Sequence, residues 1–297
     1  MSEQGESLLS ALKSRPLVMD AAMGSRLIAR GLSLEDPSDC SAIWNVTHPE
    51  DVAAVHAVDI AAGADVLLTN TFLANRIWLE PRGYGNRVKA INRWAASMAR
   101  EAAGPDRFVV GSIGPAASDD ASGVAYREQA ESLADAGVDA LLLETHTPSQ
   151  AVEALESILD TLHLPVMVSL HNWSRGDILG SVRNFEWLGV SAVGVNCVAS
   201  MRELLLHAKE LRKCTKLPLL FRPSTVPSSL RKPTEDETFD AFVSSLPMLL
   251  NLGARLIGGC CGTTEAHVAA IRAACYDWMN ATSKGRDPDE SPSTEAE

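Results

Sequence analysis

The chain has 297 residues, of which 46% are hydrophobic, and a formal net charge of −12 at pH 7. This acidic balance argues against binding to nucleic acid or to an anionic membrane, because both favour a basic protein face. No apolar run approaches the roughly 18 residues that span a bilayer, and residues 1–16 lack the apolar core of a signal peptide. We therefore expect a cytoplasmic protein with no nucleic-acid or membrane partner.

A repeated unit organises the chain: a short apolar run that ends in a polar or glycine residue, followed by a helix-like stretch. Eight such runs cover residues 17–20, 65–70, 108–114, 140–144, 165–169, 192–197, 218–222 and 254–260. Most are apolar nearly throughout, as expected for parallel strands buried on both faces. Eight strand–helix units favour a (β/α)8 TIM barrel, and no strand is followed by the Gly-x-Gly-x-x-Gly turn of nucleotide-binding folds.

Helix signals lie between these runs. The segment 47–50 (Thr-His-Pro-Glu) has the pattern of a capping box that begins a helix. Helices are also predicted over 126–136, 148–162 and 237–252, and the first and last of these stop at a glycine. The stretch 180–196 is several residues short for the helix and strand expected there.

The units predict a single barrel domain over residues 15–280. Residues 1–14 are predicted to form an extra N-terminal helix that could plug the bottom of the barrel. Residues 281–297 contain five acidic and two basic residues among many Pro and Ser, and we expect a disordered acidic tail.

Three cysteines lie at predicted strand ends, where the catalytic residues of such barrels are found. Cys197 ends its run, and Cys260 and Cys261 close the last run within Gly-Gly-Cys-Cys-Gly. Neighbouring side chains of a regular strand face opposite ways, but the flanking glycines free the backbone so that both thiols can turn to one point. A buried cysteine is often only a small hydrophobe, yet this triplet favours a metal, and soft thiolate ligands favour zinc. The cysteines without a partner at ligand spacing, expected to be structural, are Cys40, Cys214 and Cys275.

Three protein ligands leave the fourth position of a catalytic zinc open for substrate. Three thiolates make the metal electron-rich, which suits binding of a substrate thiol as thiolate better than activation of water. The implied reaction is attack by a zinc-bound thiolate on an activated carbon.

Two carboxylates end predicted strands that are otherwise apolar, namely Asp20 and Glu144. A carboxylate in such a place is unfavourable unless it is paired. The two groups either accept hydrogen bonds from loop amides or hold a substrate ammonium group. Together with a thiol-binding zinc, they suit a substrate that carries both an amine and a thiol.

Six segments match one known pattern in order and spacing over about residues 15–275. They are 20–24 (Asp-Ala-Ala-Met-Gly), 69–76 (Thr-Asn-Thr-Phe-Leu-Ala-Asn-Arg), 111–115 (Gly-Ser-Ile-Gly-Pro), 144–145 (Glu-Thr), 194–197 (Gly-Val-Asn-Cys) and 258–264 (Gly-Gly-Cys-Cys-Gly-Thr-Thr). These segments resemble the homocysteine S-methyltransferase family. The resemblance implies a (β/α)8 barrel that transfers a methyl group to homocysteine to form methionine.

The resemblance also implies roles for individual residues. One zinc is expected on Cys197, Cys260 and Cys261. Asp20 and Glu144 correspond to the positions that hold the homocysteine amine. The two residues implied to lie beside the substrate and the zinc are Asn70 and Asn196, and Asn196 could shield or ligate the metal while homocysteine is absent.

Within the family, the segments Thr-Asn-Thr-Phe and Cys-Cys-Gly-Thr-Thr look most like the homocysteine-binding module of cobalamin-dependent methionine synthase. That module continues into pterin- and cobalamin-binding domains, which this sequence does not contain. We therefore expect the methyl donor to be a methylated corrinoid, such as methylcobalamin, carried on a separate protein. S-methylmethionine or betaine as the donor is the alternative.

The sequence departs from the family pattern around the predicted pocket mouth. Asp-Ala-Ala at 20–22 replaces an Asp-Gly start, His146 replaces an aromatic residue, and Arg-Pro-Ser-Thr-Val at 222–226 replaces Pro-Asn-Ala-Gly. These changes keep open an acceptor that is another thiol or a selenol. A non-catalytic zinc- or thiol-binding subunit of a methyl-transfer assembly is a further alternative.

Two histidines and a redox role were also weighed. His146 either packs inside the protein or contacts substrate, whereas His171 is expected to be structural or to anchor a loop. Redox sensing through Cys260 and Cys261 is disfavoured, because the sequence offers no signal for a partner that such a sensor would control.

Overall fold

The computed structural model describes residues 6–116, 122–171, 178–225 and 234–284. Eight parallel strands form one sheet in the order β1-β8-β7-β6-β5-β4-β3-β2, and a parallel bridge between Met19 and Val66 joins its two edges. The prediction of a (β/α)8 barrel is thereby confirmed. The strands are β1 (Leu17–Val18), β2 (Val66–Leu68), β3 (Phe108–Ile113), β4 (Ala140–His146), β5 (Val166–Leu170), β6 (Ala192–Asn196), β7 (Leu219–Arg222) and β8 (Ala254–Ile257).

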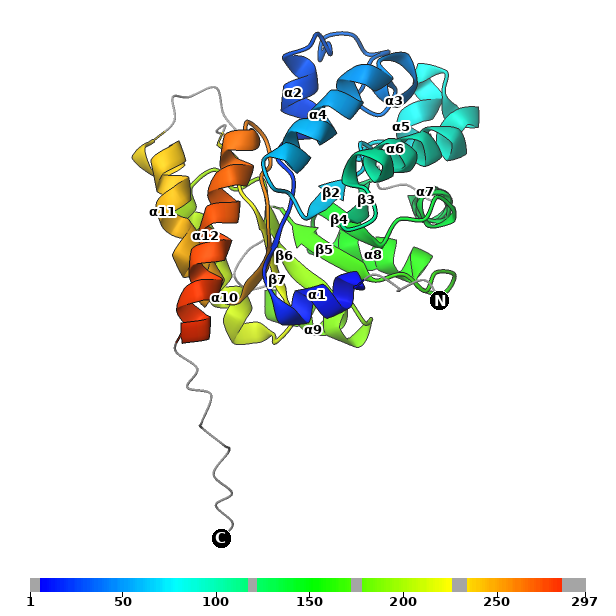
Figure 1. The fold of residues 1–297 in the computed structure, drawn as a ribbon. Helices are drawn as coiled ribbons and strands as arrows, with labels where there is room; N and C mark the ends of the chain where they lie inside the picture. The colour runs from blue at the N-terminus through cyan, green and yellow to red at the C-terminus, as the bar shows by residue number, and fades with distance from the viewer. Residues whose placement is uncertain (1–5, 117–121, 172–177, 226–233, 285–297) are drawn as a thin grey trace, which may run out of the picture.

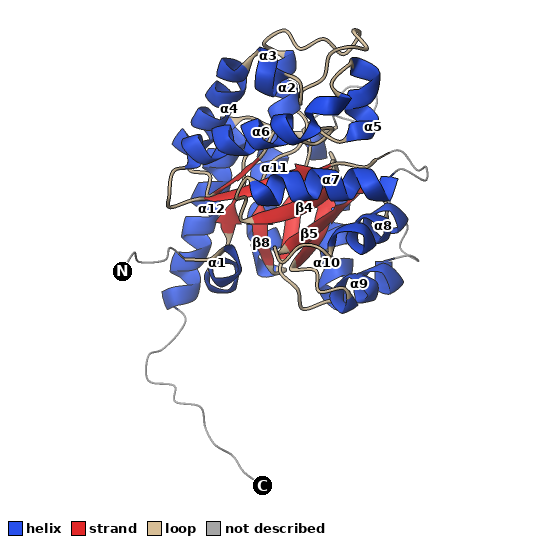
Figure 2. Cartoon of the chain, turned by 90° about the vertical axis from the view of Figure 1, so that its right-hand side faces the viewer, coloured by secondary structure: helices blue, strands red, loops and turns tan. Residues whose placement is uncertain are grey.

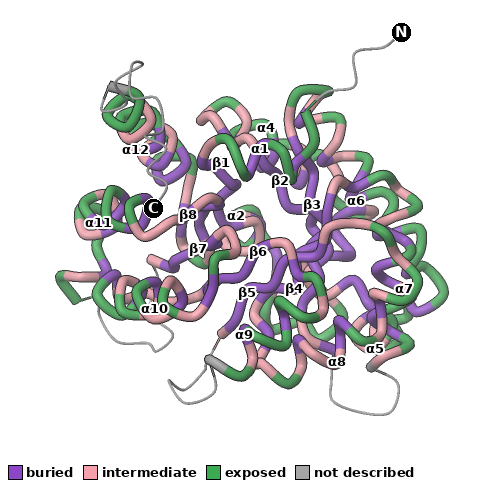
Figure 3. Tube along the Cα trace, turned by 90° about the horizontal axis from the view of Figure 1, so that it is seen from below, coloured by how far each residue is buried: buried purple, intermediate pink, exposed green. Residues whose placement is uncertain are grey.

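Helices surround the strands on the outside of the barrel (Figure 2). Their inner faces are buried and their outer faces exposed, as the view along the barrel in Figure 3 shows. No helix in the described ranges is long and apolar enough to cross a membrane. The α-helices are α1 (Leu8–Ser14), α2 (Met23–Ile28), α3 (Trp44–Thr47), α4 (Pro49–Ala61), α5 (Arg76–Leu79), α6 (Val88–Ala103), α7 (Ser122–Asp135), α8 (Pro148–Ile158), α9 (Ile178–Trp187), α10 (Met201–Cys214), α11 (Phe239–Asn251) and α12 (Glu265–Lys284).

The N-terminal helix α1 closes the bottom of the barrel and covers the second half of the range 1–14 in which the sequence predicts an extra helix. Its buried side chains Leu8, Ala11 and Leu12 belong to the same apolar cluster as the residues that fill the barrel interior. Figure 1 shows α1 below the strands, at the end opposite α2 and α3. Because α2 follows β1, that opposite end is the carboxyl end of the strands, where the functional residues of such barrels lie.

The last strand ends earlier than predicted. β8 stops at Ile257, three residues before Cys260, and the pair of cysteines lies in the loop that follows. One reason is that its partner β7 stops at Arg222, since the next residue, Pro223, has no N–H to continue the ladder. The side chains of Cys260 and Cys261 therefore do not have to point to opposite faces of the sheet, as they would within a strand.

The predicted capping box at residues 47–50 is wrong. Thr47 ends α3, and its hydroxyl donates to the carbonyl of Ile43, while α4 begins at Pro49 without a side-chain cap. Proline is suited to the first helical position, because the N–H it lacks has no partner there.

The predicted helix ends differ from the observed ones by a few residues. The stretch 180–196, judged short for a helix and a strand, contains most of the ten-residue α9, which begins at Ile178, and all of β6. Helix α12 extends to Lys284, into the range predicted as a tail, and residues 285–297 lie outside the described ranges.

The strand that leads to Cys197 has no room for a side chain at Gly194. A methyl group there would lie 1.6 Å from the carbonyl oxygen of Leu220 on β7. We expect Gly194→Ala to lower the free energy of unfolding by at least about 2 kcal/mol, because the backbone of β7 must move. Urea denaturation measures this loss.

Gly180→Ala is the matched control. Gly180 lies in α9 and is exposed, and apart from its own helix backbone and chain neighbours no atom lies within 4 Å of the added methyl position. Alanine should raise the stability of this helix by up to about 1 kcal/mol. Equal effects of the two substitutions would contradict the close packing of β6 on β7.

Candidate active site at the carboxyl end of the barrel

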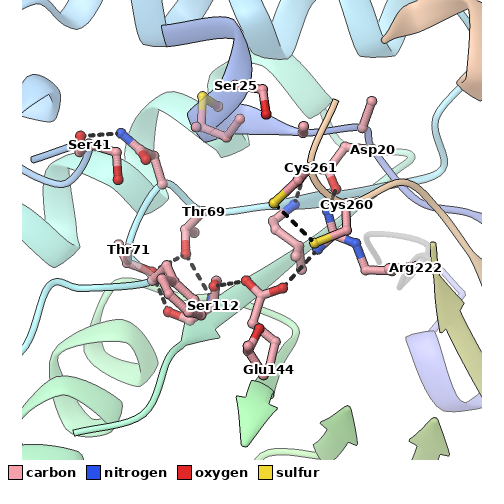
Figure 4. Close-up of a pocket in the computed structure, with 18 of the residues that line it drawn as sticks. Asp20, Ser25, Ser41, Thr69, Thr71, Ser112, Glu144, Arg222, Cys260 and Cys261 are labelled. Atoms are coloured by element: carbon pink, nitrogen blue, oxygen red, sulfur yellow. Dashed lines mark hydrogen bonds and ion pairs between the residues drawn. The ribbon is translucent and has the colours of Figure 1, made fainter. Parts of the chain in front are cut away.

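A cavity of about 380 Å³ opens among the loops at the carboxyl end of the strands (Figure 4). It receives side chains from loops or strand ends that are far apart in the sequence. The polar and sulfur-containing residues that line it are Asp20, Met23, Ser25, Ser41, Thr69, Asn70, Thr71, Ser112, Glu144, Thr145, Cys197, Arg222, Cys260 and Cys261.

The three predicted cysteines meet at this cavity. The sulfur atoms of Cys197 and Cys260 are 2.7 Å apart, those of Cys260 and Cys261 are 4.0 Å apart, and all three lie within 4.8 Å of one another. All three cysteines are free, and Cys261 is the exposed member. Within the described ranges, no other group of His, Cys, Asp and Glu side chains forms such a cluster.

Close backbone packing places the cysteine pair. A methyl group on Gly258 would lie 2.8 Å from the carbonyl oxygen of Asp20, and one on Gly259 would lie 2.1 Å from the hydroxyl of Thr263. Glycine is thus required at these two positions because Asp20 and Thr263 leave no room for a side chain. The sequence suggested backbone freedom as the role of the two glycines. The loop after β8 therefore lies in close contact with the residues that follow β1, and Cys260 and Cys261 line the cavity.

A left-handed backbone places the third cysteine. Cys197 has φ of 59°, and Thr145 at the end of β4 has φ of 65°. Among the described residues, these are the two non-glycine residues with positive φ. Such a conformation is unfavourable for a side-chain-bearing residue and is concentrated at functional sites, because surrounding contacts must enforce it.

Asn196 connects these two residues. It is fully buried, and its Oδ1 accepts hydrogen bonds from the amide of Thr145 (3.0 Å) and the hydroxyl of Ser169 (2.8 Å). Its Nδ2 points to the sulfur atoms of Cys197 (3.4 Å) and Cys260 (4.0 Å). The amide therefore presents hydrogen, and not oxygen, to the sulfur cluster in this arrangement.

The sulfur cluster fits a divalent metal. Hydrogen bonds from the thiols of Cys197 and Cys260 lower the pKa of Cys261, whereas hydrogen bonds with Cys260 and Cys261 raise the pKa of Cys197. A tetrahedral zinc with Zn–S bonds of about 2.3 Å separates its sulfur ligands by about 3.8 Å, within the range spanned here.

The carboxylates Asp20 and Glu144 both face the cavity and are buried. One oxygen of Asp20 accepts the amide of Leu68 at 2.7 Å, and one oxygen of Glu144 accepts the hydroxyl of Ser112. Burial raises the pKa of Asp20 to about 7, and the pKa of Glu144 is raised for the same reason. Arg222 opposes both shifts because its positive charge favours the ionised carboxylates.

Arg222 is the important residue that the sequence analysis did not assign to the site. It ends β7, is 4% exposed, and forms ion pairs with Asp20 (3.1 Å) and Glu144 (3.3 Å). Its Nε and Nη2 also donate to the carbonyl oxygen of Gly259. A charged residue at the end of an apolar strand was the signal that identified the two carboxylates, and it applied equally to Arg222.

The remaining predicted residues lie in different places. Asn70 lines the cavity, and its Nδ2 donates to the carbonyl oxygen of Ser41 and to Asn45. His146 is fully buried outside the cavity lining, and its Nδ1 contacts the carbonyl oxygen of Glu144 at 3.0 Å. Desolvation lowers the pKa of His146 to about 4, so its ring is neutral at physiological pH. His171 donates its backbone amide to the carbonyl of His146.

The comparison with protein families is decisive. The model of the family described as Homocysteine S-methyltransferase matches residues 17–275. The chain belongs to the homocysteine S-methyltransferase family. The matched range contains all eight strands and the three clustered cysteines, so the resemblance inferred from six segments is confirmed over the whole barrel.

Curated relatives of two lengths share this homocysteine S-methyltransferase region. The methionine synthase of Mycobacterium tuberculosis (strain ATCC 25618 / H37Rv) is 30% identical over 304 residues, which cover 90% of this chain and 25% of the relative. The Homocysteine S-methyltransferase of Escherichia coli (strain K12) is 30% identical over 311 residues, covering 86% of this chain and 94% of the relative. The chain thus spans about a quarter of the mycobacterial protein's length.

Solved structures of the homocysteine S-methyltransferase family have the same fold. The metallated form of the homocysteine methyltransferase MmuM from Escherichia coli matches with a TM-score of 0.74 at 28% identity, covering 88% of this chain and 97% of the other. Its oxidized form matches with a TM-score of 0.75 at 27% identity, covering 90% and 99%.

The raised pKa of Asp20 predicts a pH-dependent stability difference between the wild type and Asp20→Asn. Between its usual value of 3.8 and about 7, the folded state keeps this proton while the unfolded state loses it. The stability that the protonated group contributes is therefore fully present below pH 3.8 and is lost as the pH rises to about 7. Denaturation of metal-free protein from pH 4 to 8 should show the wild type losing stability relative to Asp20→Asn over this window.

Asp36→Asn is the control, because the contribution of Asp36 to stability should change with pH in the opposite direction. Asp36 is exposed, and hydrogen bonds from Ser38 lower its pKa, so its small contribution should be lost as the pH falls. A stability difference between wild type and Asp20→Asn that stays constant across the whole pH range would contradict the burial effect on Asp20.

Proposed function

We propose that this family member is a zinc-dependent methyltransferase that transfers a methyl group to the thiolate of homocysteine and so forms methionine. The observation that carries the proposal is the cluster of Cys197, Cys260 and Cys261 beside a cavity that also contains two buried carboxylates. Membership of the homocysteine S-methyltransferase family supports the same acceptor, and the metallated form of a related structure supports a bound metal.

Zinc held by the three cysteines would supply the Lewis acidity that keeps an incoming thiol deprotonated at neutral pH. Asn196 donates toward two of the cysteine sulfurs and so disperses their negative charge. The closed end of the barrel formed by α1 leaves the carboxyl end as the route by which acceptor and donor meet.

The remaining residues position the acceptor. Asp20 and Glu144 are proposed to receive the ammonium end of homocysteine, since each carboxylate oxygen can accept a second hydrogen bond. Asn70 is proposed to lie beside the bound acceptor, because it lines the same cavity and is held by Ser41 and Asn45. The acceptor sulfur attacks the methyl carbon with a lone pair and forms the new S–C bond. The bond between the methyl group and the donor breaks at the same time, and the electron pair of that bond remains with the donor. Because the protein holds both reactants in the geometry of the reaction, this step becomes effectively unimolecular.

The proposed donor is a methylated corrinoid carried on a separate protein. Support comes from the segments that resemble the homocysteine-binding module of cobalamin-dependent methionine synthase. A corrinoid ring is larger than the cavity, so its methyl group would be presented at the cavity mouth.

Metal analysis tests the zinc site. Wild-type protein purified under reducing conditions should contain one zinc per chain, and Cys261→Ala should lose it, since even a supporting group contributes up to about 100-fold in metal affinity. Cys214→Ala is the control, because Cys214 is partly buried outside the cluster. X-ray absorption should show a fourth sulfur beside the metal when homocysteine is added. Wild-type protein that binds no zinc would contradict the proposal.

A comparison of donors tests the second half of the reaction. Zinc-loaded protein with homocysteine should form methionine faster from methylcobalamin than from equal concentrations of S-methylmethionine or betaine, because the family segments match the corrinoid-using module. Cys261→Ala should abolish turnover with every donor. If S-methylmethionine reacts as fast as any methylcorrinoid, the corrinoid proposal is wrong.

A further inference from the structure

The guanidinium of Arg222 stands between the two carboxylates that the proposed function assigns to the acceptor's ammonium group. Its Nη2 is 3.1 Å from Oδ1 of Asp20, and its Nη1 is 3.3 Å from Oε2 of Glu144. Two hydrogen bonds to the carbonyl oxygen of Gly259, at 3.0 and 2.8 Å, hold it from a third side. Figure 4 shows these side chains facing the same space as Cys260.

Each oxygen of the Asp20 and Glu144 carboxylates already accepts a hydrogen bond from the protein before a thiol substrate enters. Arg222 satisfies one oxygen of Asp20 and one of Glu144. The amide of Leu68 satisfies the other oxygen of Asp20, and the hydroxyl of Ser112 satisfies the other oxygen of Glu144. The chain itself therefore supplies the cation and the hydrogen bonds that two buried carboxylates require.

This arrangement changes what an amine on the acceptor contributes. A site dedicated to an amine rejects an analogue that lacks it by about 10⁴-fold, because the buried partner groups are then left unpaired. In this site Asp20 and Glu144 remain paired with Arg222 when the bound thiol has no amine. An amino thiol is accepted as well, because each carboxylate oxygen can accept a second hydrogen bond.

We propose that Arg222 supplies Asp20 and Glu144 with the positive charge that an acceptor's ammonium group would otherwise have to provide, and so determines acceptor specificity: the site takes thiols without an amine nearly as well as amino thiols. This inference rests on the proposed function, since it assumes an acceptor whose sulfur reaches the cysteine cluster. It also gives a role to the segment 222–226, one of the places where the sequence departs from the family pattern.

Binding of two thiols to zinc-loaded protein tests the inference. Isothermal titration would measure the dissociation constants of homocysteine and of 4-sulfanylbutanoate, which has the same carbon chain and carboxylate but no amine. In the wild type the two constants should differ by less than about tenfold, whereas a dedicated amine site predicts about 10⁴-fold. A wild-type preference for homocysteine of that larger size overturns the inference.

Variants at Arg222 give a second measurement. Arg222→Met leaves both carboxylates without their cation, so the preference for homocysteine should rise by about 100-fold or more, and Arg222→Lys, which keeps the charge, should stay near the wild type. Arg100→Met is the matched control, because Arg100 pairs with Asp139 away from the cavity lining. An unchanged preference in folded Arg222→Met overturns the inference; should that variant fail to fold, the wild-type ratio and Arg222→Lys decide.

The outcomes separate this inference from the proposed function. If homocysteine binds and 4-sulfanylbutanoate does not, the role of Arg222 is overturned while the proposed function stands. If neither thiol binds to the zinc-loaded protein, the proposed function is overturned, and the role of Arg222 with it.

Discussion

One buried guanidinium joins four strand ends at the carboxyl end of the barrel. Arg222 on β7 contacts Asp20 after β1, Glu144 on β4 and the carbonyl of Gly259 after β8. A buried charge is strongly unfavourable without such partners, and each of these three charged side chains would be left uncompensated without the others. The cysteine cluster depends on the same frame, because Gly259 directly precedes Cys260 and its amide donates to the carbonyl of Asp20.

The cysteine side of the site is held by backbone conformations that are unfavourable in isolation. Cys197 and Thr145 both have positive φ, and Asn196 connects them through its hydrogen bonds to the Thr145 amide and toward the Cys197 sulfur. Such conformations persist only where the surrounding structure enforces them. The closed sheet provides that support, since β6 packs on β7 with no space for a side chain at Gly194.

The two halves of the site differ in how closely they follow the family. The half with the three cysteines and their glycine-rich loop lies within the range that matches the homocysteine S-methyltransferase family and resembles the family pattern. The half that would meet the polar end of the acceptor contains Arg222, whose charge compensates the carboxylates expected to bind an amine. The proposed chemistry at sulfur can therefore be combined with the proposed change of preference for the rest of the acceptor.

The sequence by itself determined the barrel, the eight strands within a few residues, and the three cysteines, because apolar runs and glycine-rich loops are local patterns. It placed the end of β8 too late and predicted a false capping box at residues 47–50, where tertiary contacts override local preference. It also did not reveal that Arg222 pairs with Asp20, 202 residues earlier in the chain. Only the tertiary structure decided that pairing, because closing the barrel brings the first and seventh strand ends to one cavity.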